Sequence, residues 1–461
     1  MSPKKKIHFE ISERKILLRF IDFIFVISAL CFLGQVFQFS YFYVSWSNFY
    51  WTLVLGFYLV FFGTIFELYN LQVASNEYAT VKNVILTSIS TVLFYLLTPI
   101  LTPMLPENRL QIIYFFVAVL LSLLLWRFIY LKFFASTRFV KRVLFICDSK
   151  SLQKKVDDLI FVNPHYQVLG YVPTNFETEN DSSFFAVSLE SIENFIASHA
   201  LTEIVIAFKE NENVNTALYE KLLDLLEAGI TIRAYDQVYE ASTNRLPVTY
   251  LSKDFYKYFP FSRSNQNKFY LLIVRFLEVI FSLVGLGFLI LLLPLLMLLN
   301  IGWNKGALFY TQERVGKNNK PFVIFKLRTM VVGAEKNGAA YATINDSRVT
   351  TFGRFLRKTR IDEMPQFFNI LKGDMSILGP RPERPVFVNQ IAERLPFYKT
   401  RHVIKPGLTG WAQVNHAYTE SIDDALIKLQ YDLFYIKHRS VFLDINIIIK
   451  TIGTVLFYKG Q

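Results

Sequence analysis

The first third of the chain alternates long apolar stretches with short polar connections. Four stretches are long enough to cross a bilayer, which takes about 20 apolar residues; they lie at 20–45, 49–67, 81–104 and 110–134. The pattern therefore predicts a bundle of four transmembrane helices.

The charges at the two ends of this bundle predict its orientation. Lysines 4–6 precede the first stretch, and a basic segment at 127–142 follows the fourth. Because cytoplasmic ends of membrane segments are rich in Lys and Arg, both ends are expected in the cytoplasm. Arg19 and Asp22 interrupt the start of the first stretch, and no small-residue cleavage site follows it. This stretch is thus predicted to stay in place as a membrane helix rather than to be removed as a signal peptide.

Between 142 and 260 short apolar runs alternate with amphipathic segments. We expect strands at 142–147, 168–172, 203–208 and 231–235, and helices at 151–160 and 213–228. This alternation is typical of a small parallel α/β domain. The first strand is followed by Asp148-Ser149-Lys150, where dinucleotide-binding domains have glycines that let the backbone approach a pyrophosphate. We therefore interpret the domain as regulatory or structural.

A further apolar stretch at 269–301 contains Pro294 and has two interpretations. It is either a fifth spanning helix kinked at the proline, or a re-entrant helical hairpin that is broken near Pro294 and returns to the side it came from. A spanning helix would place the following basic region outside, against the usual distribution of charge. Further on, residues 441–452 alternate apolar positions with Asp444 and Lys450, which suits an interfacial helix or a packed core helix.

Composition agrees with a membrane protein. Of 461 residues, 52% are hydrophobic, with 46 Phe and 25 Tyr, which is too apolar for an ordinary soluble chain. The net charge is +12, and residues 301–461 hold 24 Lys and Arg against 13 Asp and Glu, which suits anionic lipid head groups and diphosphates. No nucleic-acid-binding motif occurs, so nucleic acid is not expected as a partner. The two cysteines and six scattered histidines predict neither a disulfide framework nor a zinc site.

Residues 357–382, RKTRIDEMPQFFNILKGDMSILGPRP, combine many charged side chains with prolines and glycines that constrain or bend the backbone. Asp362 and Glu363 stand just before Pro365, a residue tolerated in a first helical turn, so the pair is expected at a helix N-terminus. Adjacent side chains diverge by roughly 100° on a regular helix, so two neighbouring acids share one centre only where a helix begins or the backbone bends. An N-cap followed by a favourable first-turn charge is the alternative interpretation.

Three arginines favour a functional site over that alternative. Arg357, Arg360 and Arg381 supply planar guanidinium groups of the kind that bind phosphate through two hydrogen bonds. The segment 379–382, Gly-Pro-Arg-Pro, rigidly mounts the last of them. Acids and cations in this mixture suit phosphoryl transfer.

These residues resemble the catalytic core of the bacterial sugar transferase family, the monotopic polyprenyl-phosphate hexose-1-phosphate transferases or phosphoglycosyl transferases. Three further stretches agree, in the expected order: QERVG at 312–316, KLRTM at 326–330 and KPGLTGWAQVN at 405–415. The resemblance covers roughly residues 265–461, and the upstream organisation is similar to that of the longer members.

For the fold, the resemblance implies a membrane α-helical bundle plus α/β architecture. We expect four N-terminal transmembrane helices in 1–138, a degenerate Rossmann-like domain in 139–262, and a catalytic domain in 263–461 with a re-entrant membrane helix at 269–301. It also implies a multi-pass protein of the bacterial inner membrane with both globular domains in the cytoplasm. Membrane lipids are expected partners, and an apolar bundle is compatible with a homo-oligomer.

For the activity, the resemblance implies transfer of hexose-1-phosphate from a UDP-sugar to polyprenyl (undecaprenyl) phosphate, with release of UMP. This would be the initiating membrane step of exopolysaccharide, capsule or O-antigen synthesis. The sugar itself is not predicted. Competing interpretations are a non-catalytic membrane scaffold and a membrane-anchored nucleotide-sugar-modifying enzyme, which would need the glycine fingerprint that is missing here.

For the site, the resemblance implies Asp362 as the nucleophile, with Glu363 binding the metal or acting on the acceptor proton. Mg²⁺ would be held by Asp362 and Glu363. The family's functional lysine and arginines fall on Lys326, Arg357 and Arg381, and Arg328 and Arg360 join them as candidate substrate-binding residues. Without the resemblance, Lys326 and Arg328 would equally suit a basic strand that faces the membrane.

Overall fold

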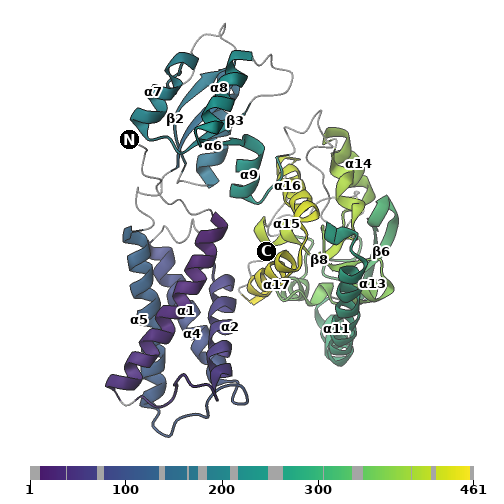
Figure 1. Ribbon diagram of the computed structural model, residues 1–461. Helices are drawn as coiled ribbons and strands as arrows, with labels where there is room; N and C mark the ends of the chain where they lie inside the picture. The colour runs from purple at the N-terminus through teal and green to yellow at the C-terminus, as the bar shows by residue number, and fades with distance from the viewer. Residues whose placement is uncertain are drawn as a thin grey trace. The chain divides into compact units, whose positions relative to one another are not determined.

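The structure, a computed structural model, describes residues 11–37, 39–69, 77–133, 141–162, 166–174, 184–207, 216–247, 263–304, 306–334, 346–395, 397–416 and 422–456. The chain divides into two compact units, 1–243 and 244–461 (Figure 1). The domain limits expected near 138 and 262 lie outside the described residues and stay predictions.

The first unit contains a bundle of apolar helices (Figure 1). Its members are α1 (Ile11–Val36), α2 (Phe49–Ile65), α4 (Glu77–Leu96) and α5 (Leu110–Phe133), and each overlaps one of the four predicted stretches. By length and composition α1 and α5 can cross a membrane, whereas α2 and α4 are shorter apolar helices. Several apolar helices are therefore confirmed, and four complete spans stay a prediction.

Two of the predicted stretches extend too far. α1 ends at Val36, and Phe39, Tyr41 and Phe42, which follow it, are packed into the bundle core. There the Tyr41 ring meets the Phe115 ring edge-on. α4 ends at Leu96, ahead of a segment at 97–104 that contains two prolines. The apolar pattern overestimated both helices because a packed aromatic connection and a proline-containing turn are as hydrophobic as a helix.

The first unit also contains a four-stranded sheet of β1 (Lys141–Cys147), β2 (Tyr166–Pro173), β3 (Glu203–Ile206) and β4 (Thr231–Ala234). The order is β2-β1-β3-β4, and every pair is parallel, which confirms the small parallel sheet. The accompanying helices are α6 (Ser149–Val162), α7 (Ile192–His199), α8 (Thr216–Glu227) and α9 (Tyr235–Thr243). The sequence did not predict α7 or α9, and Tyr235 begins α9 rather than ending a strand.

The second unit is mostly helical, with two small sheets. The antiparallel pair is β5 (Phe309–Val315) with β6 (Pro321–Leu327), and the parallel pair is β7 (Ser376–Leu378) with β8 (Gly407–Thr409). The helices are α11 (Lys268–Trp303), α12 (Thr351–Lys358), α13 (Gln366–Lys372), α14 (Pro385–Arg394), α15 (Trp411–Asn415), α16 (Ile422–His438) and α17 (Val441–Leu456). Short 3₁₀ turns include η6 (Ile361–Glu363) and η7 (Tyr398–Val403).

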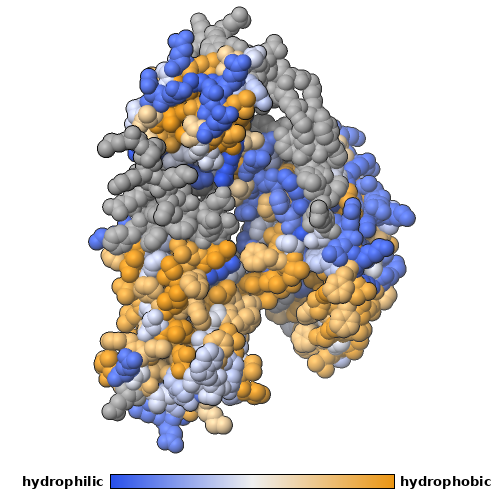
Figure 2. Space-filling view, viewed as in Figure 1, coloured by the Kyte–Doolittle hydropathy of each residue, from blue (hydrophilic) through white to orange (hydrophobic). Residues whose placement is uncertain are grey.

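The apolar stretch predicted at 269–301 is the helix α11, and it runs through Pro294 without ending. The expected break into two helices at this proline is therefore not observed. Leu289 and Leu296, on either side of the proline, pack into one cluster with Leu356 of α12, so tertiary contacts hold both halves of the helix. Its outer face is apolar, as the orange surface of Figure 2 shows. The re-entrant path stays a prediction.

Candidate active site

The acid pair lies on η6, a 3₁₀ turn between α12 and α13. Arg360 enters the turn with a left-handed backbone, φ 59°, which is uncommon for a residue with a side chain. Asp362 and Glu363 are only 8% and 7% exposed. The chain bends sharply here and then starts α13 after Pro365. This bend is what lets two adjacent carboxylates share one site.

Glu363 is surrounded by positive charge. Its Oε1 accepts a hydrogen bond from Arg381 at 2.8 Å and lies 3.6 Å from both Lys326 Nζ and Arg360 NH1. Burial alone would raise the pKa of Glu363, but Arg381, Lys326 and Arg360 together hold it well below the usual range. Glu363 is therefore ionised and gathers three cations around one oxygen.

The carboxylate of Asp362 has fewer direct partners than that of Glu363. Its Oδ1 is buried and accepts no hydrogen bond from the described residues. Burial and the charge of Glu363 raise the pKa of Asp362 to about 6, although Lys326, Arg360 and Arg357 act in the opposite direction. Burying a carboxylate oxygen without a hydrogen-bond partner costs free energy unless a ligand supplies that partner. This buried oxygen is therefore the atom of Asp362 that is left without a hydrogen-bond partner among the described residues.

Lys326 reaches Glu363 from β6, and the side chain of Asn369 aligns that strand with α13. The fully buried Asn369 accepts a hydrogen bond from Phe325 N at 3.1 Å and donates one to Val323 O at 2.7 Å. It thereby takes the place of a neighbouring strand along the edge of β6. Burial lowers the pKa of Lys326 to about 8, although Glu363 acts to raise it.

Arg357 lies on the last turn of α12 and is oriented by Thr329. Its Nε donates to Thr329 Oγ1 at 2.9 Å. The helix approaches this segment closely, because a Cβ added to Gly353 would lie 1.9 Å from the Thr329 carbonyl oxygen. Any other residue at 353 would push α12, and with it Arg357, away from the site.

Arg328 is not brought to the acid pair. Its NH2 donates to the carbonyl oxygen of Asn304 at 2.8 Å, and Asn304 Nδ2 donates to the Arg328 carbonyl at 2.7 Å. These contacts join β6 to the end of α11. Among the described contacts Arg328 is an anchor of that helix, and its substrate-binding role stays a prediction.

The inner face of α11 makes polar contacts with the elements around the site. The Arg275 guanidinium donates to the carbonyls of Ile370 and Leu371 at 2.6 and 2.7 Å, at the C-terminus of α13. The buried Glu278 accepts a hydrogen bond from Ser376 of β7. The apolar helix therefore contacts this unit along its length, from its first turns to its last.

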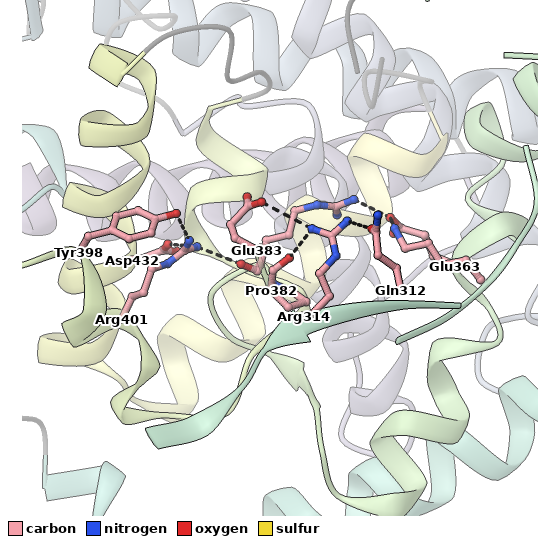
Figure 3. Close-up of polar contacts among 10 residues, drawn as sticks. Gln312, Arg314, Glu363, Pro382, Glu383, Tyr398, Arg401 and Asp432 are labelled. Atoms are coloured by element: carbon pink, nitrogen blue, oxygen red, sulfur yellow. Dashed lines mark hydrogen bonds and ion pairs between the residues drawn. The ribbon is translucent and has the colours of Figure 1, made fainter. Parts of the chain in front are cut away.

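Two arginines that sequence reasoning missed fix the backbone of the loop that carries Arg381 (Figure 3). Arg401 NH2 donates to the Arg381 carbonyl at 3.0 Å, and Arg314 NH1 donates to the Pro382 carbonyl at 3.1 Å. Arg314 also donates to Gln312 Oε1 at 2.6 Å. The stretch QERVG contains Arg314, so the family resemblance could have identified it. Nothing in the sequence near Arg401 singles it out.

A metal would find few ligands here besides the acid pair. The described residues contain no group of three His, Cys, Asp or Glu side chains placed to hold a metal ion. Mg²⁺ is nevertheless often bound by one or two carboxylates together with substrate phosphates. The unpartnered Oδ1 of Asp362 is an oxygen ligand of the kind that Mg²⁺ binds, so the residues present fit Mg²⁺ bound jointly with a diphosphate.

Comparison with known proteins relates the chain to the same family that its sequence motifs resemble. The model of the bacterial sugar transferase family matches residues 269–458. A UDP-N-acetylgalactosamine-undecaprenyl-phosphate N-acetylgalactosaminephosphotransferase from Aeromonas hydrophila is 51% identical over 151 residues, which are 33% of this chain and 36% of that protein. A Bacillus subtilis protein named "Putative undecaprenyl-phosphate N-acetylgalactosaminyl 1-phosphate transferase" is 47% identical over 31% of this chain and 79% of its own length.

A third relative extends the match. A UDP-glucose:undecaprenyl-phosphate glucose-1-phosphate transferase from Xanthomonas campestris pv. campestris is 35% identical over 242 residues, which are 51% of this chain and 47% of that protein. The matches thus span less than half of the Aeromonas and Xanthomonas proteins. The chain belongs to the bacterial sugar transferase family.

Proposed function

We propose that this protein transfers hexose-1-phosphate from a UDP-sugar to undecaprenyl phosphate, releasing UMP. The observation that carries the proposal is the buried acid pair, in which Glu363 gathers three cations beside the unpartnered Oδ1 of Asp362. Such a site can neutralise a diphosphate and present a nucleophile to it. The names of the relatives support the same reaction class.

In the first step, a carboxylate oxygen of Asp362 attacks the phosphorus next to the sugar. An oxygen–phosphorus bond forms, the phosphoanhydride bond breaks, and UMP leaves with the electron pair. Lys326, Arg360 and Arg381, which already converge on Glu363, bind the diphosphate and its developing charge. Mg²⁺ held by Asp362 and Glu363, when bound, would add further charge neutralisation.

In the second step, a phosphate oxygen of undecaprenyl phosphate attacks the same phosphorus and releases Asp362. Arg357, fixed by Thr329, is a candidate for binding the incoming phosphate. Glu363 serves mainly to hold the cations, since its Oε1 already contacts three of them. Whether it also takes part in proton transfer at the acceptor is tested by its Gln variant, which keeps the shape and loses the charge.

We further propose a multi-pass protein of the bacterial inner membrane, with both globular parts in the cytoplasm and α11 re-entering the leaflet it came from. The polar inner face of α11 supports this path, because it contacts the same unit near both ends. Cysteines placed at Asn265 and Lys305, on either side of α11, should both react with an impermeant reagent from the cytoplasmic side only. Labelling of the Lys305 position from outside would establish a fifth span.

The decisive test of the activity is UMP release by the purified full chain with undecaprenyl phosphate and a panel of UDP-sugars. The panel includes UDP-N-acetylgalactosamine and UDP-glucose, the sugars in the names of the relatives. A sugar-dependent signal supports a role in starting a surface polysaccharide and identifies the sugar. No UMP from any donor would favour a non-catalytic scaffold, and a modified UDP-sugar would favour a nucleotide-sugar-modifying enzyme.

A further inference from the structure

The position of the Arg381 guanidinium depends on the backbone from which it extends. The carbonyl of Arg381 accepts a hydrogen bond from Arg401, and the next carbonyl, of Pro382, accepts one from Arg314. The side chain of Arg381 leaves this same backbone to reach Glu363 at 2.8 Å. A change in the orientation of the carbonyl would therefore move the guanidinium relative to the acid pair.

Arg401 is itself held by three partners from three segments of the chain (Figure 3). Its NH2 lies 2.6 Å from Asp432 Oδ2 on α16 and 3.0 Å from the Arg381 carbonyl, and its NH1 lies 2.7 Å from Tyr398 Oη on η7. The Arg401 residue is 4% exposed. A planar guanidinium can bind these partners in fixed directions, whereas a lysine ammonium at the end of a flexible stem cannot reproduce that fork.

We propose that Arg401 is a positioning residue for Arg381, and that its buried pair with Asp432 serves to hold the Arg381 guanidinium in the geometry that binds a nucleoside diphosphate. This rests on the proposed function in one respect, that Arg381 contacts the donor diphosphate. The alternative is a buried ion pair that only stabilises the fold. The bundle contains a second buried arginine–aspartate pair for comparison, Arg127 with Asp22, also at 2.6 Å.

The test is a double-mutant cycle on the full chain in lipid nanodiscs, read by calorimetric titration with UDP. Arg401→Lys should weaken UDP binding roughly tenfold, because the misplaced Arg381 guanidinium would lose its contact with the diphosphate. A loss of about tenfold is the usual effect of losing one charge-assisted contact. In an Arg381→Lys background the same change should weaken binding less than about twofold, because the positioned guanidinium is already gone. Equal weakening in both backgrounds would overturn the positioning role.

Arg127→Lys is the matched control, since it alters a buried arginine pair that has no described contact with the site. It should leave UDP affinity unchanged in both backgrounds. If Arg401→Lys does not accumulate in the membrane, Tyr398→Phe replaces it in the cycle, because this change removes one hydroxyl and keeps the ion pair. Its effect should be smaller and should again disappear when Arg381 is changed; an additive result would overturn the proposal.

UMP release, measured in parallel, separates this inference from the proposed function. If the effects of the Arg401 and Arg381 substitutions on UDP affinity are coupled but no donor yields UMP, the positioning role stands and the proposed reaction is refuted. Normal UMP release with an additive cycle would refute the positioning role alone. Absence of both UDP binding and UMP release would overturn both.

Discussion

Among the described residues, each unit buries an arginine–aspartate pair, and the two pairs differ in what else the arginine contacts. In the bundle, Arg127 of α5 meets Asp22 of α1 at 2.6 Å, with the Tyr69 ring 5.7 Å from the guanidinium carbon. In the second unit, Arg401 meets Asp432 at the same distance and also donates to the backbone of the Arg381 loop.

On the positioning role proposed for Arg401, the further contacts of a buried ion pair indicate function, and its burial alone does not. The bundle pair joins two helices that are far apart in the sequence, and its loss would leave a charge in an apolar interior. In the second unit, the arginine of the pair also holds the backbone of Arg381, a residue of the candidate site. A third contact, to backbone that carries a functional side chain, is the feature that separates the two.

The largest expected effect comes from the acid pair of the second unit, matched by a change in the bundle. Asp362→Asn should lower UMP release at least about a thousandfold, because an amide is no anionic nucleophile. Asp22→Asn should keep the rate per folded molecule. Mass spectrometry of the wild-type chain without acceptor should find hexose-phosphate on the peptide that contains Asp362. Release at the wild-type rate by Asp362→Asn would eliminate the covalent step.

Removal of divalent metal should have the next largest effect. Excess chelator should lower UMP release more than about a hundredfold and Mg²⁺ should restore it, because the diphosphate needs charge neutralisation beyond the protein's own cations. Thermal unfolding of either unit should not change, since the described residues hold no structural metal cluster. Full turnover in chelator would remove Mg²⁺ from the mechanism.

The two ion pairs can be compared directly by truncating their acids. Asp22→Ala and Asp432→Ala each leave a buried guanidinium unpaired, which should cost about 3–5 kcal/mol of unfolding free energy. Only Asp432→Ala should also raise the KM for the UDP-sugar in the molecules that remain folded. Denaturant unfolding in detergent and initial-rate kinetics measure the two effects. An equal rise in KM for Asp22→Ala would mean that both pairs act only through global stability.

The smallest expected effect is a bell-shaped pH profile that belongs to the second unit alone. The pKa of Asp362 is raised to about 6, so below this pH the carboxyl binds a proton and loses nucleophilicity. The pKa of Lys326 is lowered to about 8, so above this pH its charge is lost. The ratio kcat/KM should fall about tenfold per unit below pH 6 and decline above pH 8.

The matched variant for this profile is Lys326→Arg. A guanidinium stays charged throughout the range, so the alkaline decline should disappear while the acid limb remains. Asp22→Asn should leave both limbs in place. A profile that is flat between pH 5 and 9 would contradict the assignment of both groups.

The sequence could predict the features that repeat along the chain or lie within one short segment. Apolar stretches indicated the helices of the bundle and α11, alternation of strands and helices indicated the parallel sheet, and the run at 357–382 contained Asp362, Glu363 and three of the cations near them. These are local properties, because periodicity and residue type depend only on neighbours in the chain. The ends of α1 and α4 were misplaced because packed aromatic residues and prolines are as apolar as the helices themselves. The helices α7 and α9 were missed, and the break expected at Pro294 is not observed.

Only the tertiary structure decided which cations meet Glu363 and what holds them there. Lys326 and Arg328 are two residues apart, yet one reaches the acid pair and the other anchors α11. Arg401 and Asp432 have no sequence pattern that connects them with Arg381, because their contact arises where η7, α16 and a loop pack together. Hydrogen bonds and ion pairs depend on distance and direction in space, and packing between segments remote in sequence sets both.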